Sequence, residues 1–165
     1  MKIPRDEAVL IDTNVILEAH RTRCWEHLAG FFDLKTVDTC VVECETGNQR
    51  RNNPVPVDTH ALMEKVHVER ITQEQLAALR IRLANRVDLD PGEESLITYA
   101  CQHSDAWLIC SPDKAAVRAC AFLGFLDRVI ALEDLTESSG IAVPLRQNYT
   151  RHWLANFRTV ILLEL

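Results

Sequence analysis

An uninterrupted apolar run that ends at an acidic residue constrains the fold of this chain most. Residues 8–11 read AVLI, and Asp12 follows them directly. A strand without polar alternation is buried on both faces, which is typical of parallel sheets covered by helices on both sides. We therefore expect a parallel sheet, with Asp12 at the carboxyl end of one of its strands.

Strand-like and helical segments alternate along the remaining chain. Two capping boxes mark helix starts, Thr72 with Gln75 and Asp90 with Glu93, and Pro91 occupies the first position of the second helix. The expected strands cover residues 8–11, 35–38, 66–71, 107–110 and 128–130, and the expected helices cover 13–20, 24–32, 40–47, 72–86, 90–103, 113–122, 131–138 and 149–165. This alternation predicts an α/β fold of three layers, α/β/α, with a mostly parallel central sheet of about five strands.

The length and charge of the chain limit its class. The 165 residues suit one domain over 1–165, with a C-terminal helical extension at about 144–165. No apolar stretch approaches the ~18 residues of a membrane span and no signal peptide is evident, so we expect a cytoplasmic protein without a membrane partner. The 18 Lys and Arg residues against 24 Asp and Glu give a net charge of −6, so a nucleic-acid binder would need a local basic surface.

Three acidic residues lie near the ends of expected strands, where open α/β sheets place their functional sites. Asp12 ends the first strand, and Asp113 comes shortly after the strand over residues 107–110. Glu43 lies about one turn into the helix that follows the second strand. We expect these carboxylates to lie at the same edge of the sheet.

A fourth acid, Glu94, lies in the first turn of the helix that Asp90 opens. Helical spacing places Glu94 on the same stripe as Ile97 and Cys101, which we expect to face the core. The capping box, in contrast, already accounts for Glu93. Because an inward carboxylate is costly unless it is paired or binds a cation, the spacing predicts that Glu94 belongs to a site.

Converging carboxylates point to a divalent cation. Four of them would repel one another, and Mg²⁺ or Mn²⁺ would relieve the repulsion because these hard cations take oxygen ligands. Such sites serve phosphodiester hydrolysis. Each acid also has an ordinary explanation, since aspartate at a helix N-terminus is stabilised by the helix dipole and a lone glutamate is often solvated. Their joint placement favours the metal site.

Other phosphate chemistries lack their residues. A haloacid-dehalogenase phosphatase needs a second aspartate two positions after Asp12, and that position is Asn14. The glycines are scattered rather than clustered as in a Walker loop or a dinucleotide fingerprint.

The segments around these acids resemble the PIN-domain nuclease family, and within it the VapC-like toxin ribonucleases of toxin–antitoxin systems. The similar segments are IDTNVIL around Asp12, the isolated Glu43, DPGEESLITYA around Glu94, and LICSPDKAAVRACAFLGF around Asp113, over roughly residues 9–130. The resemblance implies a five-stranded parallel sheet and a metal-dependent endoribonuclease. It further implies that Asp12, Glu43, Glu94 and Asp113 bind the metal and catalyse, while Asn14 and Ser111 support the site.

Arginine residues offer a candidate surface for RNA around the acidic site. Arginine is the better bidentate phosphate ligand, and a basic rim is expected from Arg50, Arg51, Arg82, Arg86 and Arg118. These arginines are equally consistent with solubilised helix surfaces. The apolar C-terminal run VILLEL is expected to dock on the core or to form an interface. The resemblance adds a homodimer and an antitoxin protein as expected partners.

Three functional hypotheses remain open at this point. The first is a Mg²⁺- or Mn²⁺-dependent endoribonuclease that acts as the toxin of a toxin–antitoxin pair. The second is a non-catalytic PIN-like module that binds RNA or a protein. The third, which we rank lowest, is metal-dependent cleavage of DNA flaps.

Overall fold

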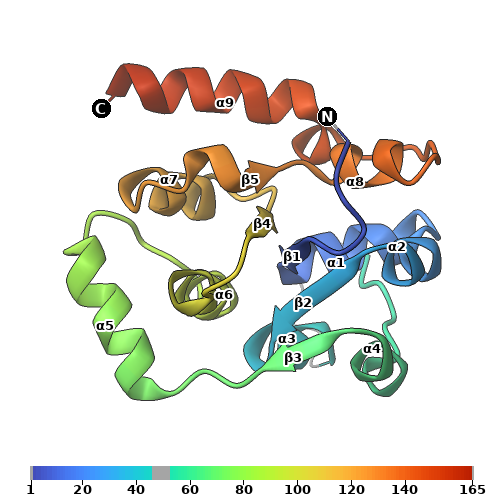
Figure 1. Cartoon of the computed structure of the whole chain (residues 1–165), viewed down its shortest axis with the longest axis horizontal. Coiled ribbons are helices and arrows are strands. Elements are labelled where there is room, and N and C mark those ends of the chain that lie inside the picture. The colour runs from blue at the N-terminus through green and yellow to red at the C-terminus, as the bar shows by residue number, and fades with distance from the viewer. Residues whose placement is uncertain (1, 46–52, 165) are drawn as a thin grey trace.

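A parallel five-stranded sheet forms the centre of the computed structural model, which describes residues 2–45 and 53–164 (Figure 1). The strands are β1 (Ala8–Ile11), β2 (Asp33–Val37), β3 (His67–Glu69), β4 (Trp107–Cys110) and β5 (Val129–Ile130), in the order β3-β2-β1-β4-β5. All neighbouring strands are parallel, and Ile11 at the end of β1 lies opposite Cys110 at the end of β4. The expected three-layer α/β/α fold is confirmed.

Helices connect the strands and cover both faces of the sheet (Figure 1). They are α1 (Thr13–Arg21), α2 (Trp25–Phe31), α3 (Asp38–Glu45), α4 (Thr59–Lys65), α5 (Gln73–Leu83), α6 (Pro91–Gln102), α7 (Lys114–Phe122), α8 (Leu132–Ser138) and α9 (Arg151–Glu164), with short 3₁₀ turns η1 (Leu126–Arg128) and η2 (Gln147–Tyr149). Since every strand runs in the same direction, all carboxyl ends lie at one edge of the sheet. The carboxyl ends of β1 and β4 are neighbours there, because these two strands are paired.

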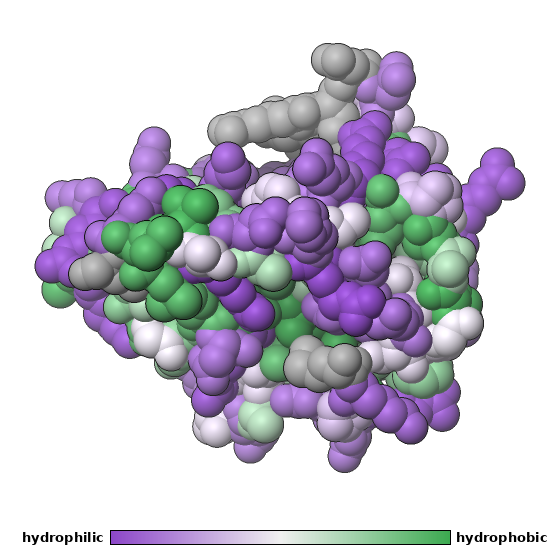
Figure 2. Space-filling model, turned by 90° about the horizontal axis from the view of Figure 1, so that it is seen from above, coloured by the Kyte–Doolittle hydropathy of each residue, from purple (hydrophilic) through white to green (hydrophobic). Residues whose placement is uncertain are grey.

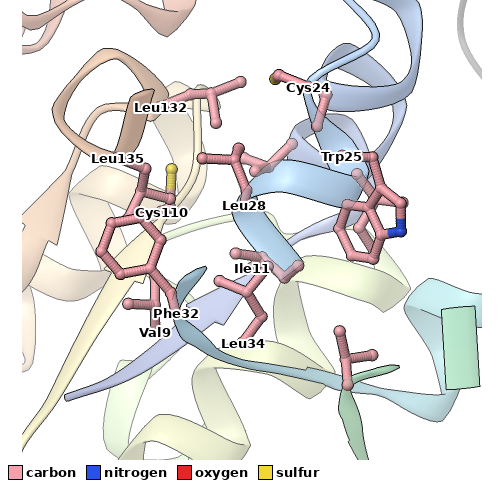
Figure 3. Close-up of a cluster of buried hydrophobic side chains, with 14 of the residues drawn as sticks. Val9, Ile11, Cys24, Trp25, Leu28, Phe32, Leu34, Cys110, Leu132 and Leu135 are labelled. Carbon is pink, nitrogen blue, oxygen red and sulfur yellow. The ribbon is translucent and has the colours of Figure 1, made fainter. Parts of the chain in front are cut away.

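Successive side chains of β1 enter two different cores. Val9 and Ile11 pack with α1, α2, α4 and α8, as Figure 3 shows in part. Ala8 and Leu10 pack with α5, α6, α7 and α9 on the other face. No residue of β1 is more than 5% exposed, so the prediction of a strand buried on both faces is confirmed.

Several helix boundaries differ from those expected. Helix α4 was not anticipated, although Asp58 caps it by accepting a hydrogen bond from the Ala61 N–H (3.1 Å). Helix α5 ends three residues before the expected boundary of 86, because Ala84 and Asn85 adopt left-handed backbone conformations with φ of 48° and 58°. The pair Ser111–Pro112 was expected to cap the helix after the strand over residues 107–110, whereas Asp113 is the N-cap of α7.

The C-terminal helix α9 packs against α7 and α8 with one stripe only (Figure 1). Leu154, Phe157 and Ile161 are buried, whereas Leu162 and Leu163 are exposed. Seen from above in Figure 2, apolar side chains gather at the left, where the C-terminal end of α9 lies. The VILLEL run thus docks in part and leaves an apolar end open to solvent. Within the described ranges, no helix combines the length and apolarity that a bilayer crossing requires.

Candidate functional site

Asp12 lies at the carboxyl end of β1 and begins α1. Its Oδ1 accepts a hydrogen bond from the Val15 N–H (2.8 Å), which makes it the N-cap, and its Oδ2 accepts one from the Ser111 hydroxyl (2.5 Å). The side chain is 3% exposed. Burial raises its pKa to about 7, with smaller contributions from the nearby charges of Asp113 and Asp90, against the lowering effect of the two hydrogen bonds. Asp12 is therefore a buried carboxyl poised between its two protonation states.

Ser111 connects Asp12 to Asp113 across the two central strands. It directly follows β4, the neighbour of β1, and its hydroxyl oxygen also accepts the Asp113 N–H (3.2 Å). Asp113 then caps α7 through the Ala115 N–H (2.7 Å). The prediction that Ser111 supports the site agrees with these contacts, and the prediction that Asp12 and Asp113 share a sheet edge is confirmed.

Glu43 on α3 reaches the starts of two other helices. The Thr13 hydroxyl donates to its Oε2 (2.5 Å), and the Gly92 N–H in the first turn of α6 donates to its Oε1 (3.0 Å). A Cβ atom at Gly92 would lie only 2.5 Å from Oε2, so glycine is the residue that admits the carboxylate here. Thr13 follows Asp12 and Gly92 precedes Glu93, so the Glu43 carboxylate lies at the starts of both α1 and α6.

Glu93 joins the same group of acids from the first turn of α6. Its carboxylate accepts the Asp90 N–H (3.1 Å) and completes the expected capping box. Burial, followed by the charges of Asp113 and Asp90, raises the pKa of Glu93 well above its ordinary value. Glu93 therefore lies in a buried acidic environment that disfavours its ionised form.

Glu94 is turned away from this group, contrary to the expectation that its carboxylate faces inward with the other acids. Its two carboxylate oxygens accept hydrogen bonds from the Arg80 Nε (2.5 Å) and Nη2 (2.8 Å) on α5. Helical spacing did not predict the direction of Glu94 correctly, because α6 is buried on nearly every side and the spacing does not single out one inward face. Assigning Glu93 to capping alone was the second cause, since the carboxyl group that caps the helix also lies within reach of the charge of Asp113.

The other predicted residues have mixed placements. Asn14 lies in the first turn of α1, and its carbonyl oxygen accepts the Tyr149 hydroxyl (3.2 Å). Arg118 donates to both oxygens of Glu164 (3.1 and 2.9 Å) rather than facing the acids. Arg82 and Arg86 were expected on one helix face, but Arg82 is exposed on α5 and Arg86 lies beyond the end of that helix. Arg50 and Arg51 lie outside the described residues.

The assembled candidate site consists of Asp12, Glu43, Glu93 and Asp113, with Asp90 beside them. Among residues 2–45 and 53–164, no three or more His, Cys, Asp or Glu side chains already stand in a metal-holding arrangement. The Asp12 and Glu43 oxygens are instead directed to hydrogen-bond donors of the chain. Sequence reasoning missed Thr13, Gly92 and Glu93, and only the capping motif drew attention to the last of them. Comparison of the chain with models of known protein families and with curated proteins finds no match.

Proposed function

We propose that this chain is a Mg²⁺- or Mn²⁺-dependent ribonuclease whose acidic site consists of Asp12, Glu43, Glu93 and Asp113. The observation that carries the proposal is the gathering of these acids at the ends of β1 and β4, where Ser111 connects Asp12 to Asp113 and the charge of Asp113 acts on both Asp12 and Glu93. Such a group is charged at neutral pH only at a high cost unless a cation compensates it. A divalent ion among these carboxylates would supply that compensation.

The donor set suits a hard divalent cation in kind. All four groups are carboxylates, and Mg²⁺ and Mn²⁺ prefer oxygen ligands. Mg²⁺ usually takes one or two carboxylates directly and keeps several waters. Carboxylates that remain bonded to donors of the chain, as Asp12 and Glu43 are, therefore fit a role through water. When bound, the ion supplies activation of a water for attack on phosphorus and stabilises charge on the phosphoryl oxygens.

The chain itself holds these carboxylates in place. The Val15 N–H and the Ser111 hydroxyl fix both oxygens of Asp12. The Gly92 N–H and the Thr13 hydroxyl do the same for Glu43. Since the donors belong to helix starts and to the end of a strand, the acids are positioned before any ligand arrives, which is the requirement for an efficient electrostatic site.

RNA as the substrate rests on the resemblance to PIN-domain nucleases. The similar segment DPGEESLITYA contains both Glu93 and Glu94, so the similarity itself holds for either acid. The structure favours Glu93, because the charge of Asp113 acts on Glu93 whereas Glu94 pairs with Arg80.

Cleavage of a fluorescent RNA that contains both a stem and a single-stranded loop tests the proposal. We expect cleavage with Mn²⁺, none with EDTA, and losses of at least about 100-fold for Asp12→Asn and Glu93→Gln. Glu74→Gln, an exposed acid in the first turn of α5, is the matched control and should behave as wild type. Equal cleavage by wild type and Asp12→Asn, or cleavage that survives the chelator, would overturn the proposal. RNA binding without cleavage in any divalent ion would instead favour the non-catalytic module.

A further inference from the structure

A water-accessible cleft of about 270 Å³ lies between the end of α5 and the start of α6. Its polar lining consists of Arg80, Asn85, Asp88 and Glu94, and the side chains of Leu83 and Val87 are among its apolar walls. We name it the α5–α6 cleft. Glu94 in its lining follows Glu93 of the acidic site in the first turn of α6, and the two side chains face different neighbours.

Arg80 is held rigidly in this cleft although its side chain is 58% exposed. Glu94, whose side chain is 16% exposed, accepts from both Nε and Nη2 of the guanidinium group. An exposed arginine is ordinarily mobile, and a two-point bond to a more buried carboxylate fixes the plane of the group. Both hydrogen bonds lie in that plane, and within residues 2–45 and 53–164 Arg80 makes no further hydrogen bond. The flat faces of the guanidinium therefore stay available for stacking.

The charges of the cleft favour a neutral ligand over a phosphate group. Arg80 contributes one positive charge, while Glu94 and Asp88 contribute two negative charges, so the lining carries a net negative charge. A phosphodiester would meet repulsion there, whereas a nucleobase would not. Unpaired RNA bases are commonly recognised by stacking on arginine planes and by hydrogen bonds to their edges. The Asn85 amide and the Asp88 carboxylate supply both donors and acceptors for such an edge.

We propose that the α5–α6 cleft binds one unpaired nucleobase of the single-stranded RNA substrate, with the Arg80 guanidinium as the stacking surface. This inference rests on the proposed function and adds a substrate-binding site to it. Glu94 is then a positioning residue that orients Arg80. The left-handed turn at Ala84 and Asn85 ends α5 and brings the Asn85 side chain to the cleft.

The experiment compares two single-stranded RNAs that differ by missing bases. Full-length protein carrying Asp12→Asn, in Mg²⁺, is titrated by fluorescence anisotropy with an intact oligonucleotide and with the same oligonucleotide made fully abasic. Arg80→Ala and Asn85→Gly should each weaken binding of the intact RNA about tenfold and leave the abasic RNA unchanged. Asn85→Gly removes the amide at a backbone position that glycine accepts. Arg23→Gly is the control, since Arg23 is an exposed arginine at φ 60° beyond the far end of α1.

A second measurement separates this inference from the proposed function. Wild type, Arg80→Ala and Glu94→Gln are assayed with Mn²⁺ on RNA and on bis(p-nitrophenyl) phosphate, a diester without bases. The inference requires a higher KM for RNA in both variants and an unchanged rate on the small diester. Equal weakening of intact and abasic RNA, or an unaltered KM, would overturn it. If wild type does not cleave RNA but its binding depends on the bases, the nuclease proposal would be overturned and the base-binding inference would stand.

Discussion

Replacing Asp12 with asparagine is expected to stabilise the metal-free protein at neutral pH. The pKa of Asp12 is about 7 in the folded chain, because the side chain is buried, against 3.8 in an unfolded one. Between these values the folded state keeps a proton that the unfolded state has released. Folded-state stability due to this group is therefore complete below pH 3.8 and is lost as the pH rises toward 7. Asparagine carries no charge and is an equally good N-cap.

The size of the effect follows from the same two pKa values. Each pH unit between them corresponds to roughly 1.4 kcal/mol, so ionised Asp12 costs the folded state about 4 kcal/mol above pH 7. The asparagine amide must rearrange its bond with Ser111, which takes back about 1 kcal/mol. For a chain of this length, a gain of a few kcal/mol raises the melting temperature by about 10 °C.

Urea unfolding in EDTA from pH 4 to pH 8 measures the effect. The stability of Asp12→Asn relative to wild type should grow steadily with pH and level off above pH 7. Asp6→Asn, which removes an exposed carboxylate before β1, should show no such growth. Parallel stability curves for wild type and Asp12→Asn would refute the reasoning. Millimolar Mg²⁺ should stabilise wild type at pH 8 more than the variant, since a ligand that binds the folded state adds to its stability.

Three further predictions concern other parts of the chain. Gly92→Ala should lower RNA cleavage at least about tenfold, because the new Cβ displaces the flexible end of the Glu43 side chain. The melting temperature should change little, since alanine favours the helix. Unchanged cleavage would contradict this prediction. Burial lowers the pKa of His20, so below about pH 6.5 the unfolded chain takes up a proton more readily than the folded one. In urea unfolding, wild type should therefore lose stability relative to His20→Asn as the pH falls below this value. Arg158→Leu should lower the free energy of unfolding by about 2–3 kcal/mol in the same assay, because the guanidinium group donates to two backbone carbonyls near β5. Thr159→Ala, at an exposed position, should lower it little.

The central fold was predictable because its signals are local. The apolar run over residues 8–11 and the capping boxes at Thr72 and Asp90 depend only on neighbours in the chain, and each appears where it was expected. The end of α5 was not predictable in the same way. Ala84 gave no indication of a left-handed conformation, since alanine ordinarily favours helix.

Of the candidate site, the sequence predicted the residues that follow the central strands, because strand pairing determines where they lie. Asp12 and Asp113 follow β1 and β4, and the pairing of these strands brings them together. The choice between Glu93 and Glu94 depends on which way α6 rotates against its neighbours, and a helix buried on nearly all sides leaves that rotation unmarked in the sequence. The contacts of Glu43 with Thr13 and Gly92 join residues distant in the chain, which no spacing reveals.

The acids at this edge of the sheet are also the anchors from which helices start. Asp12, Asp90 and Asp113 cap α1, α6 and α7 in turn. Truncating any one of them to alanine would fray the helix that it begins and shift the backbone donors that hold its neighbours. Alanine scanning would therefore mix a folding defect with a chemical one. Exchanging each aspartate for asparagine keeps the anchor and removes only the charge, so that pair of variants separates the two roles of each residue.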